Sequence, residues 1–211
     1  MLRLLRRDGT LRISLDIDVT IARIHKPILE ELNTINAAKG TPTFYTEDTH
    51  MTQYDWSGVG ESWSTIKPLY DHVWVNRHHE IELLADVSLI YGLCAHYKVE
   101  LVTQKDDHIT SLSTELWLRK HGLGGLNLNI LANGEDRVSM GFEIYIDDNP
   151  ALVAKVKNCE DKVLFLVTRR QNEQEEADGK KIIRVPSVDH ASKMLLECVR
   201  ASPRRRLALG R

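Results

Sequence analysis

The chain has 211 residues, a length that allows one substantial hydrophobic core and a small inserted subdomain. Its net charge is −2, from 28 basic and 30 acidic residues, so no overall field favours nucleic acid or an anionic membrane surface. The sequence contains no apolar run of about 18 residues, which excludes a transmembrane helix. Its three cysteines lack metal-ligand spacing, and the N-terminus does not match a signal peptide, so we expect a reduced, cytoplasmic protein.

Six short apolar runs are typical of buried strands, and patterns with helical spacing lie between most of them. The predicted strands are 11–15, 99–102, 126–131, 142–146, 163–167 and 182–185. The predicted helices are 27–38, 79–96, 110–121, 150–157 and 188–199. This alternation predicts an α/β, Rossmann-like fold with a central parallel sheet flanked by helices.

The segment from about residue 41 to residue 77 interrupts the alternation of strands and helices. It is rich in aromatic side chains, which are Phe44, Tyr45, Tyr54, Trp56, Trp63, Tyr70 and Trp74. We interpret 25–96 as a small, mainly helical insertion that folds over one end of the sheet. The core would then comprise 1–24 and 97–200, and we expect the basic tail 201–211 to be flexible.

Acidic pairs stand where two of the predicted strands end. Asp16 and Asp18 follow the first strand, and Asp147 and Asp148 follow the fourth. Because the carboxyl ends of parallel strands meet at one edge of a sheet, we expect the four carboxylates to converge. Such a buried group is unfavourable unless a cation compensates it, and Mg²⁺ prefers oxygen ligands of this kind. The sequence therefore predicts a shared Mg²⁺ site.

These motifs resemble those of the haloacid dehalogenase superfamily of phosphohydrolases, in order and in spacing. The matching residues are Asp16, Asp18 and Thr20 for its first motif, Thr103 for its second, and Asp147 and Asp148 for its fourth. The insertion between the first and second motifs looks like the small cap of one branch of this superfamily. Three shorter patterns, at 52–56, 117–122 and 146–150, are similar to the 5′(3′)-deoxyribonucleotidase-like group.

The resemblance implies a Mg²⁺-dependent phosphatase with a small phosphorylated substrate, for which a nucleoside 5′- or 3′-monophosphate is favoured. It implies that Asp16 attacks phosphorus to form an aspartyl-phosphate, while Asp18 protonates the leaving alcohol and later activates water. Thr103, Gln104 and Lys105 would bind the phosphate. The implied metal ligands are Asp16, the backbone carbonyl of Asp18, Asp147 and Asp148.

The chain departs from the family's pattern at two positions. The nucleotidase group has its third-motif lysine a few residues before Trp117, where this chain has Ser-Thr-Glu. The nearest replacements are Lys105, Lys120 and Arg137, of which we favour Lys105 because its stem starts near the phosphate end of the sheet. The second departure is Val19, which puts a stiff branched side chain where the family commonly has glycine.

Two other functions are compatible with the same residues. The missing lysine fits a catalytically weak or inactive module that binds phosphate or nucleotide. The basic tail fits a nucleic-acid 3′-phosphatase, although the near-neutral charge argues against a nucleic-acid partner. The aromatics of the insertion fit a small core better than a base-binding surface, for which Tyr54, Trp56 and Trp74 are the candidates. The sequence leaves a homodimer open.

Overall fold

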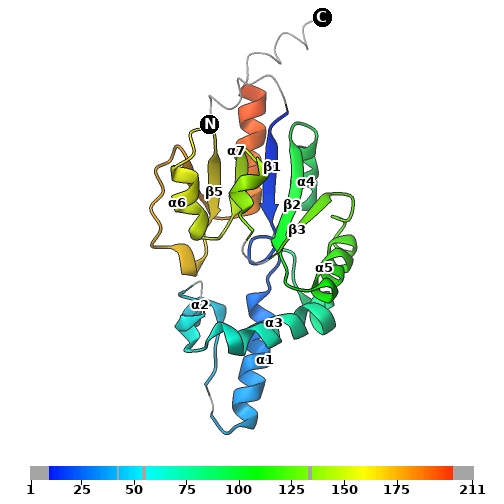
Figure 1. The fold of residues 1–211 in the computed structure, drawn as a ribbon, viewed down its shortest axis with the longest axis vertical. Helices are drawn as coiled ribbons and strands as arrows, with labels where there is room; N and C mark the ends of the chain where they lie inside the picture. The colour runs from blue at the N-terminus through cyan, green and yellow to red at the C-terminus, as the bar shows by residue number, and fades with distance from the viewer. Residues whose placement is uncertain (1–9, 42, 54–55, 133–134, 202–211) are drawn as a thin grey trace, which may run out of the picture.

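Six parallel strands form a single sheet in the computed structural model, which describes residues 10–41, 43–53, 56–132 and 135–201 (Figure 1). Tyr54 and the predicted tail from residue 202 onward lie outside the described residues. The strands are β1 (Arg12–Asp16), β2 (Lys98–Gln104), β3 (Asn127–Leu131), β4 (Ile144–Asp147), β5 (Val163–Val167) and β6 (Ile182–Val185). Their order is β3-β2-β1-β4-β5-β6, so β1 and β4 are central neighbours. The predicted α/β fold with a parallel sheet is confirmed.

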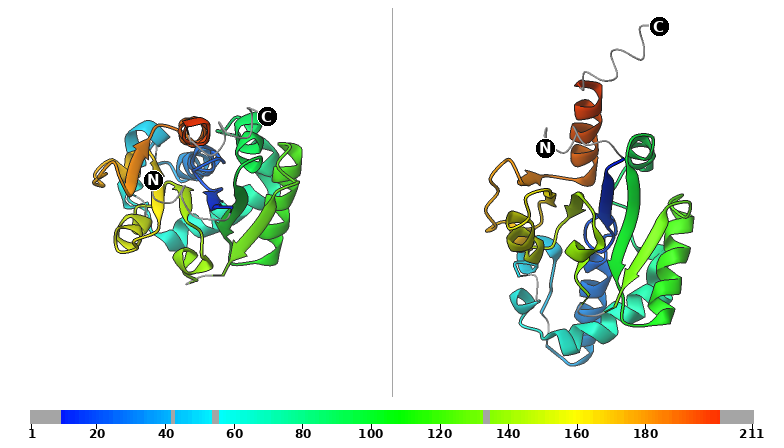
Figure 2. Two further views of the ribbon diagram at one scale, coloured as in Figure 1. Left: turned by 90° about the horizontal axis from the view of Figure 1, so that it is seen from above. Right: turned by 45° about the horizontal axis from the view of Figure 1, so that its top comes forward.

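Helices connect the strands and cover both faces of the sheet (Figure 2). They are α1 (His25–Ala38), α2 (Glu47–His50), α3 (Trp63–Arg77), α4 (Val87–Cys94), α5 (His108–Lys120), α6 (Ala151–Lys157) and α7 (Val188–Ala201). Within the described residues, none of these helices combines the length and the apolar character needed to cross a bilayer.

The predicted helix 79–96 is wrong in its first half. A 3₁₀ turn at His78–Glu80 is followed by extended chain, and α4 begins only at Val87. The extended part pairs with the loop after β1, where the Leu84 amide donates to the carbonyl of Ile21. Asp86 then caps α4 by accepting a hydrogen bond from the Ser88 amide. The apolar residues of 79–96 are therefore split between an extended segment and helix α4.

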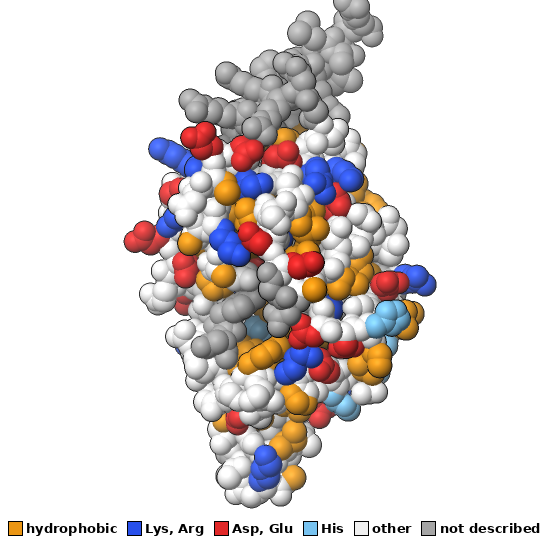
Figure 3. Space-filling model, viewed as in Figure 1, with side chains coloured by type: hydrophobic (Ala, Val, Ile, Leu, Met, Phe, Trp, Pro, Cys, Tyr) orange, Lys and Arg blue, Asp and Glu red, His pale blue; other side chains and the backbone are white. Residues whose placement is uncertain are grey.

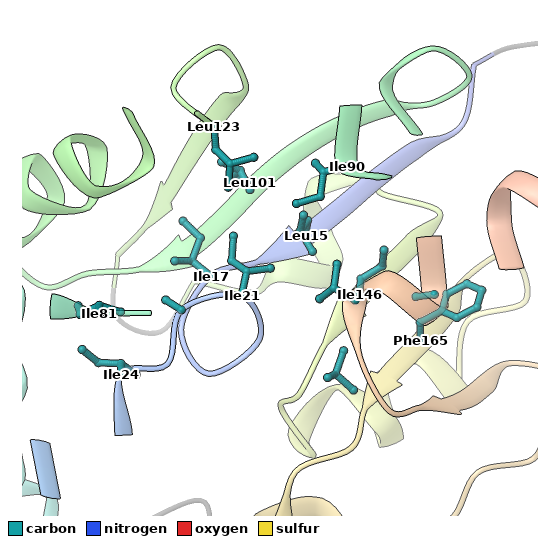
Figure 4. Close-up of a cluster of buried hydrophobic side chains, with 14 of the residues drawn as sticks. Leu15, Ile17, Ile21, Ile24, Ile81, Ile90, Leu101, Leu123, Ile146 and Phe165 are labelled. Atoms are coloured by element: carbon teal, nitrogen blue, oxygen red, sulfur yellow. The ribbon is translucent and has the colours of Figure 1, made fainter. Parts of the chain in front are cut away.

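The main core lies between the sheet and helices α4, α5 and α7. Strand pleating directs alternate residues of β1, Ile13 and Leu15, to this side. Figure 4 shows Leu15 in this layer with Ile90 of α4 and Leu101 of β2. A smaller cluster on the opposite face packs α6 against β4 and β5. The two clusters fix the central strands, and so fix the edge at which their carboxyl ends meet.

The remaining part of the second face, over β1 to β3, carries polar side chains. The connection from β3 to β4 contains only a short 3₁₀ turn, η4 (Arg137–Met140), among its described residues. Glu100 of β2 is nevertheless only 2% exposed, because Arg12 and the amides of Asn127 and Asn129 all donate to its carboxylate. This network joins three strands where a covering helix is lacking.

The insertion lies beyond the carboxyl ends of the strands, where α1, α2 and α3 form the lower part of Figure 1. Helix α4 was predicted to belong to it, but α4 packs against β2 and α7. We propose that the insertion covers about 25–80 and that α4 is part of the core.

Replacing Glu100 by Gln should make the free energy of unfolding depend less on pH in the acidic range. Burial alone would raise the pKa of Glu100, but hydrogen bonds from the two asparagines and from the neighbouring cations lower it to about 2, against an ordinary 4.5. The ionised group therefore stabilises the fold above pH 4.5, and this contribution is lost as the pH falls toward 2. We expect Glu100→Gln to lose about 1–3 kcal/mol of unfolding free energy at pH 6 and clearly less at pH 3.5, by urea titration. An equal loss at both pH values would contradict this interpretation.

Candidate active site

Three buried carboxylates converge at the carboxyl edge of the two central strands. Asp16 ends β1, Asp147 ends β4, and Asp148 directly follows it; β4 is paired with β1 through Leu15 and Ile146. One carboxylate oxygen from each of the three residues lies within 4.8 Å of the others. Thr20 links the two strand ends, because its hydroxyl donates to Asp148 Oδ1 at 2.7 Å.

Burial and mutual repulsion oppose ionisation of this cluster. Burial raises the pKa of Asp16 and of Asp147 above the ordinary aspartate value. Burial, together with the charge of Asp147, raises the pKa of Asp148 to about 7. A bound divalent cation would reverse both effects, and three oxygen donors without a sulfur or nitrogen ligand suit a hard ion such as Mg²⁺. The residues present therefore fit the predicted metal.

Arg137 is the one of the three predicted cations that contacts the carboxylate cluster. Its Nη1 lies 2.7 Å from Asp16 Oδ1 and also donates to Asp147 Oδ2. Turn η4 places it there, directly ahead of β4. Lys120 instead donates to the carbonyl of His79, and Lys105 contacts Asp18.

Asp18 lies outside the cluster of three carboxylates and accepts hydrogen bonds from two directions. From β2 and the loop after it, Thr103 Oγ1 donates at 2.6 Å and Lys105 Nζ at 2.9 Å. From helix α3, Tyr70 Oη and Trp74 Nε1 each donate at 3.0 Å. Burial alone would raise the pKa of Asp18, but the Lys105 ammonium and these hydrogen bonds outweigh it and hold that pKa below its ordinary value.

A cavity of about 390 Å³ opens between these carboxylates and the insertion. Gln104 and Lys105 form part of its wall, as do Asp16, Asp18 and Arg137. The wall on the insertion's side is largely aromatic and is formed by His25, Trp56, Trp63 and Tyr70, with Lys67 beside them. Of the aromatics predicted to contact a base, Trp56 lines the cavity, whereas Trp74 is fully buried and directs its indole N–H to Asp18.

Sequence reasoning did not find Arg169, which supports the loop after β1. This arginine follows β5, and its guanidinium donates to the carbonyls of Val19 and Thr20 at 2.9 and 3.1 Å. The available signal was its position just after a strand, because functional residues of parallel sheets gather at the carboxyl ends of strands. The same rule had selected Asp16 and Asp147. The role of Tyr70 carried no such signal, since the contact joins residues 52 positions apart.

Comparison with solved structures relates this fold to known proteins. A haloacid dehalogenase-like family hydrolase from Xanthomonas campestris matches with a TM-score of 0.53 and 15% identity, over 92% of this chain and 96% of its own. CbbY from Rhodobacter sphaeroides, in complex with phosphate, matches with a TM-score of 0.54 and 13% identity, over 85% and 95%. The chain has a haloacid dehalogenase-like fold.

A third structure with this haloacid dehalogenase-like fold is the hydrolase YfnB from Bacillus subtilis, bound to magnesium. It matches with a TM-score of 0.55 and 12% identity, over 89% of this chain and 99% of its own. No protein-family model matches the chain, and no curated protein sequence matches it.

Val19 adopts a conformation that valine rarely takes. Its φ is 66°, in the left-handed region, and the loop that contains it connects the carboxylate-bearing end of β1 to the insertion. A branched side chain in this region is strained by about 1–3 kcal/mol. The hydrogen bonds from Arg169 to the carbonyls of Val19 and Thr20 are among the contacts that hold this loop in place, together with the bond from Thr20 to Asp148.

Replacing Val19 by Gly should therefore leave the protein at least as stable, because glycine adopts positive φ without strain. Val167→Gly is the matched control, since Val167 is a fully buried valine within β5. We expect the control to lose more than about 2 kcal/mol of unfolding free energy, while Val19→Gly loses none. Thermal and urea unfolding measure both. A comparable loss in the two variants would show that the left-handed conformation carries no strain.

Proposed function

We propose that the protein is a Mg²⁺-dependent phosphomonoesterase that acts through an aspartyl-phosphate on Asp16. The convergence of Asp16, Asp147 and Asp148 beside Arg137, at the edge where ligands bind in α/β sheets, carries this proposal. Solved structures of similar fold, one in complex with phosphate and one bound to magnesium, support it.

Asp16, Asp147 and Asp148, with the carbonyl of Asp18, would hold the metal. The ion would neutralise the charge that keeps an anionic nucleophile away from a phosphate dianion. Arg137 supplies a second positive charge on the same side and orients Asp16 through its contact with Oδ1. We propose that Arg137, rather than Lys105 or Lys120, fills the role of the family's third-motif lysine.

In the first half of the reaction, an oxygen of Asp16 bonds to phosphorus as the bond from phosphorus to the leaving oxygen breaks. Asp18 gives a proton to that oxygen, so the alcohol leaves neutral. The proton has to reach Asp18 beforehand, because the Lys105 ammonium keeps this carboxylate ionised in the free protein, and a phosphate ester that binds as its monoanion would supply it. In the second half, Asp18 accepts a proton from water as the water oxygen attacks phosphorus, which releases phosphate and restores Asp16.

We propose a nucleoside monophosphate as the substrate. The cavity volume is within the range of pockets for small molecules, and its insertion side offers Trp56, Trp63 and Tyr70 to a flat apolar group. Trp63 is 49% exposed, so part of its ring is free to contact a base. On the face drawn in Figure 3, the coloured acidic and basic side chains are interspersed, and this face gives no support to a nucleic-acid strand as substrate.

A substrate panel tests this function. In the presence of Mg²⁺, the purified protein should release phosphate from 4-nitrophenyl phosphate and from nucleoside monophosphates. Phosphate release should stop when a chelator removes the metal. Asp16→Asn should lower kcat by about 10⁴-fold or more, because the amide cannot attack phosphorus. Asp178→Asn, at an exposed turn, is the control and should retain activity. Retained turnover in Asp16→Asn would exclude Asp16 as the nucleophile.

The choice among the three cations is tested by a pair of variants. Arg137→Ala removes the positive charge from Asp16 and Asp147 and should lower kcat/KM for phosphate esters by about 10²-fold. Lys120→Ala removes a cation of similar size that donates to the His79 carbonyl of the insertion, and its kcat/KM should stay within about twofold. Equal effects of the two substitutions would remove Arg137 from the site.

A further inference from the structure

Helix α3 of the insertion reaches the carboxylate of Asp18 directly. Tyr70 and Trp74 lie one helical turn apart, so both face the same side of α3. Both donate to the same oxygen, Oδ1, at 3.0 Å. Trp74 is fully buried, and its ring packs edge-on against Trp117 of α5, with 6.0 Å between ring centroids. The donor positions are therefore fixed by packing.

The Asp18 carboxylate accepts hydrogen bonds from one set of donors in the core and from a second set in the insertion. Thr103 from the core binds Oδ2, the α3 pair binds Oδ1, and Lys105 contacts both oxygens. Tyr70 and Trp74 also surround the ammonium, whose Nζ lies 2.5 Å from Tyr70 Oη and 4.0 Å from the centre of the Trp74 ring. Without α3, Oδ2 would keep Thr103 and Lys105, whereas Oδ1 would keep only Lys105 of the donors named here.

Neither α3 residue contacts the cluster of Asp16, Asp147 and Asp148 through a hydrogen bond found in the described part of the chain. Their donor atoms meet on Asp18, which lines the cavity, whereas Arg137 contacts Asp16 and Asp147. The hydroxyl of Tyr70 and the indole N–H of Trp74 are neutral donors, so they restrict the orientation of the Asp18 carboxylate without adding charge to the site. Their effect on the reaction would pass entirely through the orientation of Asp18.

We propose that Tyr70 and Trp74 are positioning residues, which orient the Asp18 carboxyl group toward the leaving oxygen and so make proton transfer depend on the docked insertion. The inference rests on the proposed function, in which Asp18 protonates that oxygen as its bond to phosphorus breaks. General acid catalysis depends strongly on such geometry, and a displaced acid loses most of its effect. The insertion would thus act on the chemical step as well as on access to the cavity.

The dependence of the rate on the leaving group distinguishes positioning from general damage. 4-Nitrophenolate leaves without needing a proton, whereas an alkoxide needs one. Saturating 4-nitrophenyl phosphate and glycerol 2-phosphate are compared for the full chain with Mg²⁺. We expect the ratio of the two kcat values, aryl over alkyl, to rise about tenfold in Tyr70→Phe and in Trp74→Phe.

Matched controls lose a buried hydroxyl donor elsewhere in the protein. Tyr97→Phe removes a hydroxyl that donates to the Leu195 carbonyl, and Tyr145→Phe removes a hydroxyl that donates to the Phe142 carbonyl. Their kcat ratios should stay at the wild-type value, whatever their melting temperatures. If one α3 variant fails to fold, the other carries the comparison.

An unchanged ratio in both α3 variants, with an active wild-type protein, would overturn the positioning role and leave the proposed function intact. A ratio that rises equally in the controls would also overturn it. A wild-type protein without phosphatase activity on either ester would instead reject the proposed function, and the positioning role with it.

Discussion

The structure depends on the burial of three carboxylates where the two central strands end. Asp16, Asp147 and Asp148 repel one another and have lost most of their water, so the arrangement persists only with positive charge nearby. Arg137 provides that charge within the chain, between Asp16 and Asp147. The surrounding contacts, such as Thr20 to Asp148, keep the strand ends close enough for one cation to serve them all.

Asp18 is only two residues from Asp16 but belongs to a different environment. Its carboxylate is turned from the cluster toward Lys105 and helix α3, so it remains ionised while its neighbours resist ionisation. Two aspartates from one short segment thereby acquire opposite tendencies toward protons. The proposed roles need the opposite order, an ionised nucleophile at Asp16 and a proton on Asp18, so they require a bound cation that lowers the pKa of Asp16 and a proton delivered to Asp18 before the reaction.

Much of this arrangement follows from simple rules about strands. Apolar runs located all six strands, and the rule that ligands bind at carboxyl ends selected Asp16, Asp147 and Asp148 before their convergence was visible. The sequence favoured Lys105, because nothing in it shows that turn η4 brings Arg137 to the Asp16 carboxylate. The prediction of one long helix over 79–96 was wrong in its first half. The apolar residues there have helical spacing, but they belong to a 3₁₀ turn and to extended chain that pairs with the loop after β1. Tyr70 and Trp74 were visible only as aromatics, since their partner is distant in sequence.

The short connection between β3 and β4 affects more than the surface it leaves open. Its described residues form one 3₁₀ turn and no α-helix, and the segment that carries Arg137 leads into the strand that carries Asp147. Guanidinium and carboxylate lie ten positions apart in one continuous segment, and no other described helix or strand stands between η4 and β4. The charge that offsets Asp16 and Asp147 is therefore supplied by the connection that leads into β4, so the length of that connection sets where this charge lies.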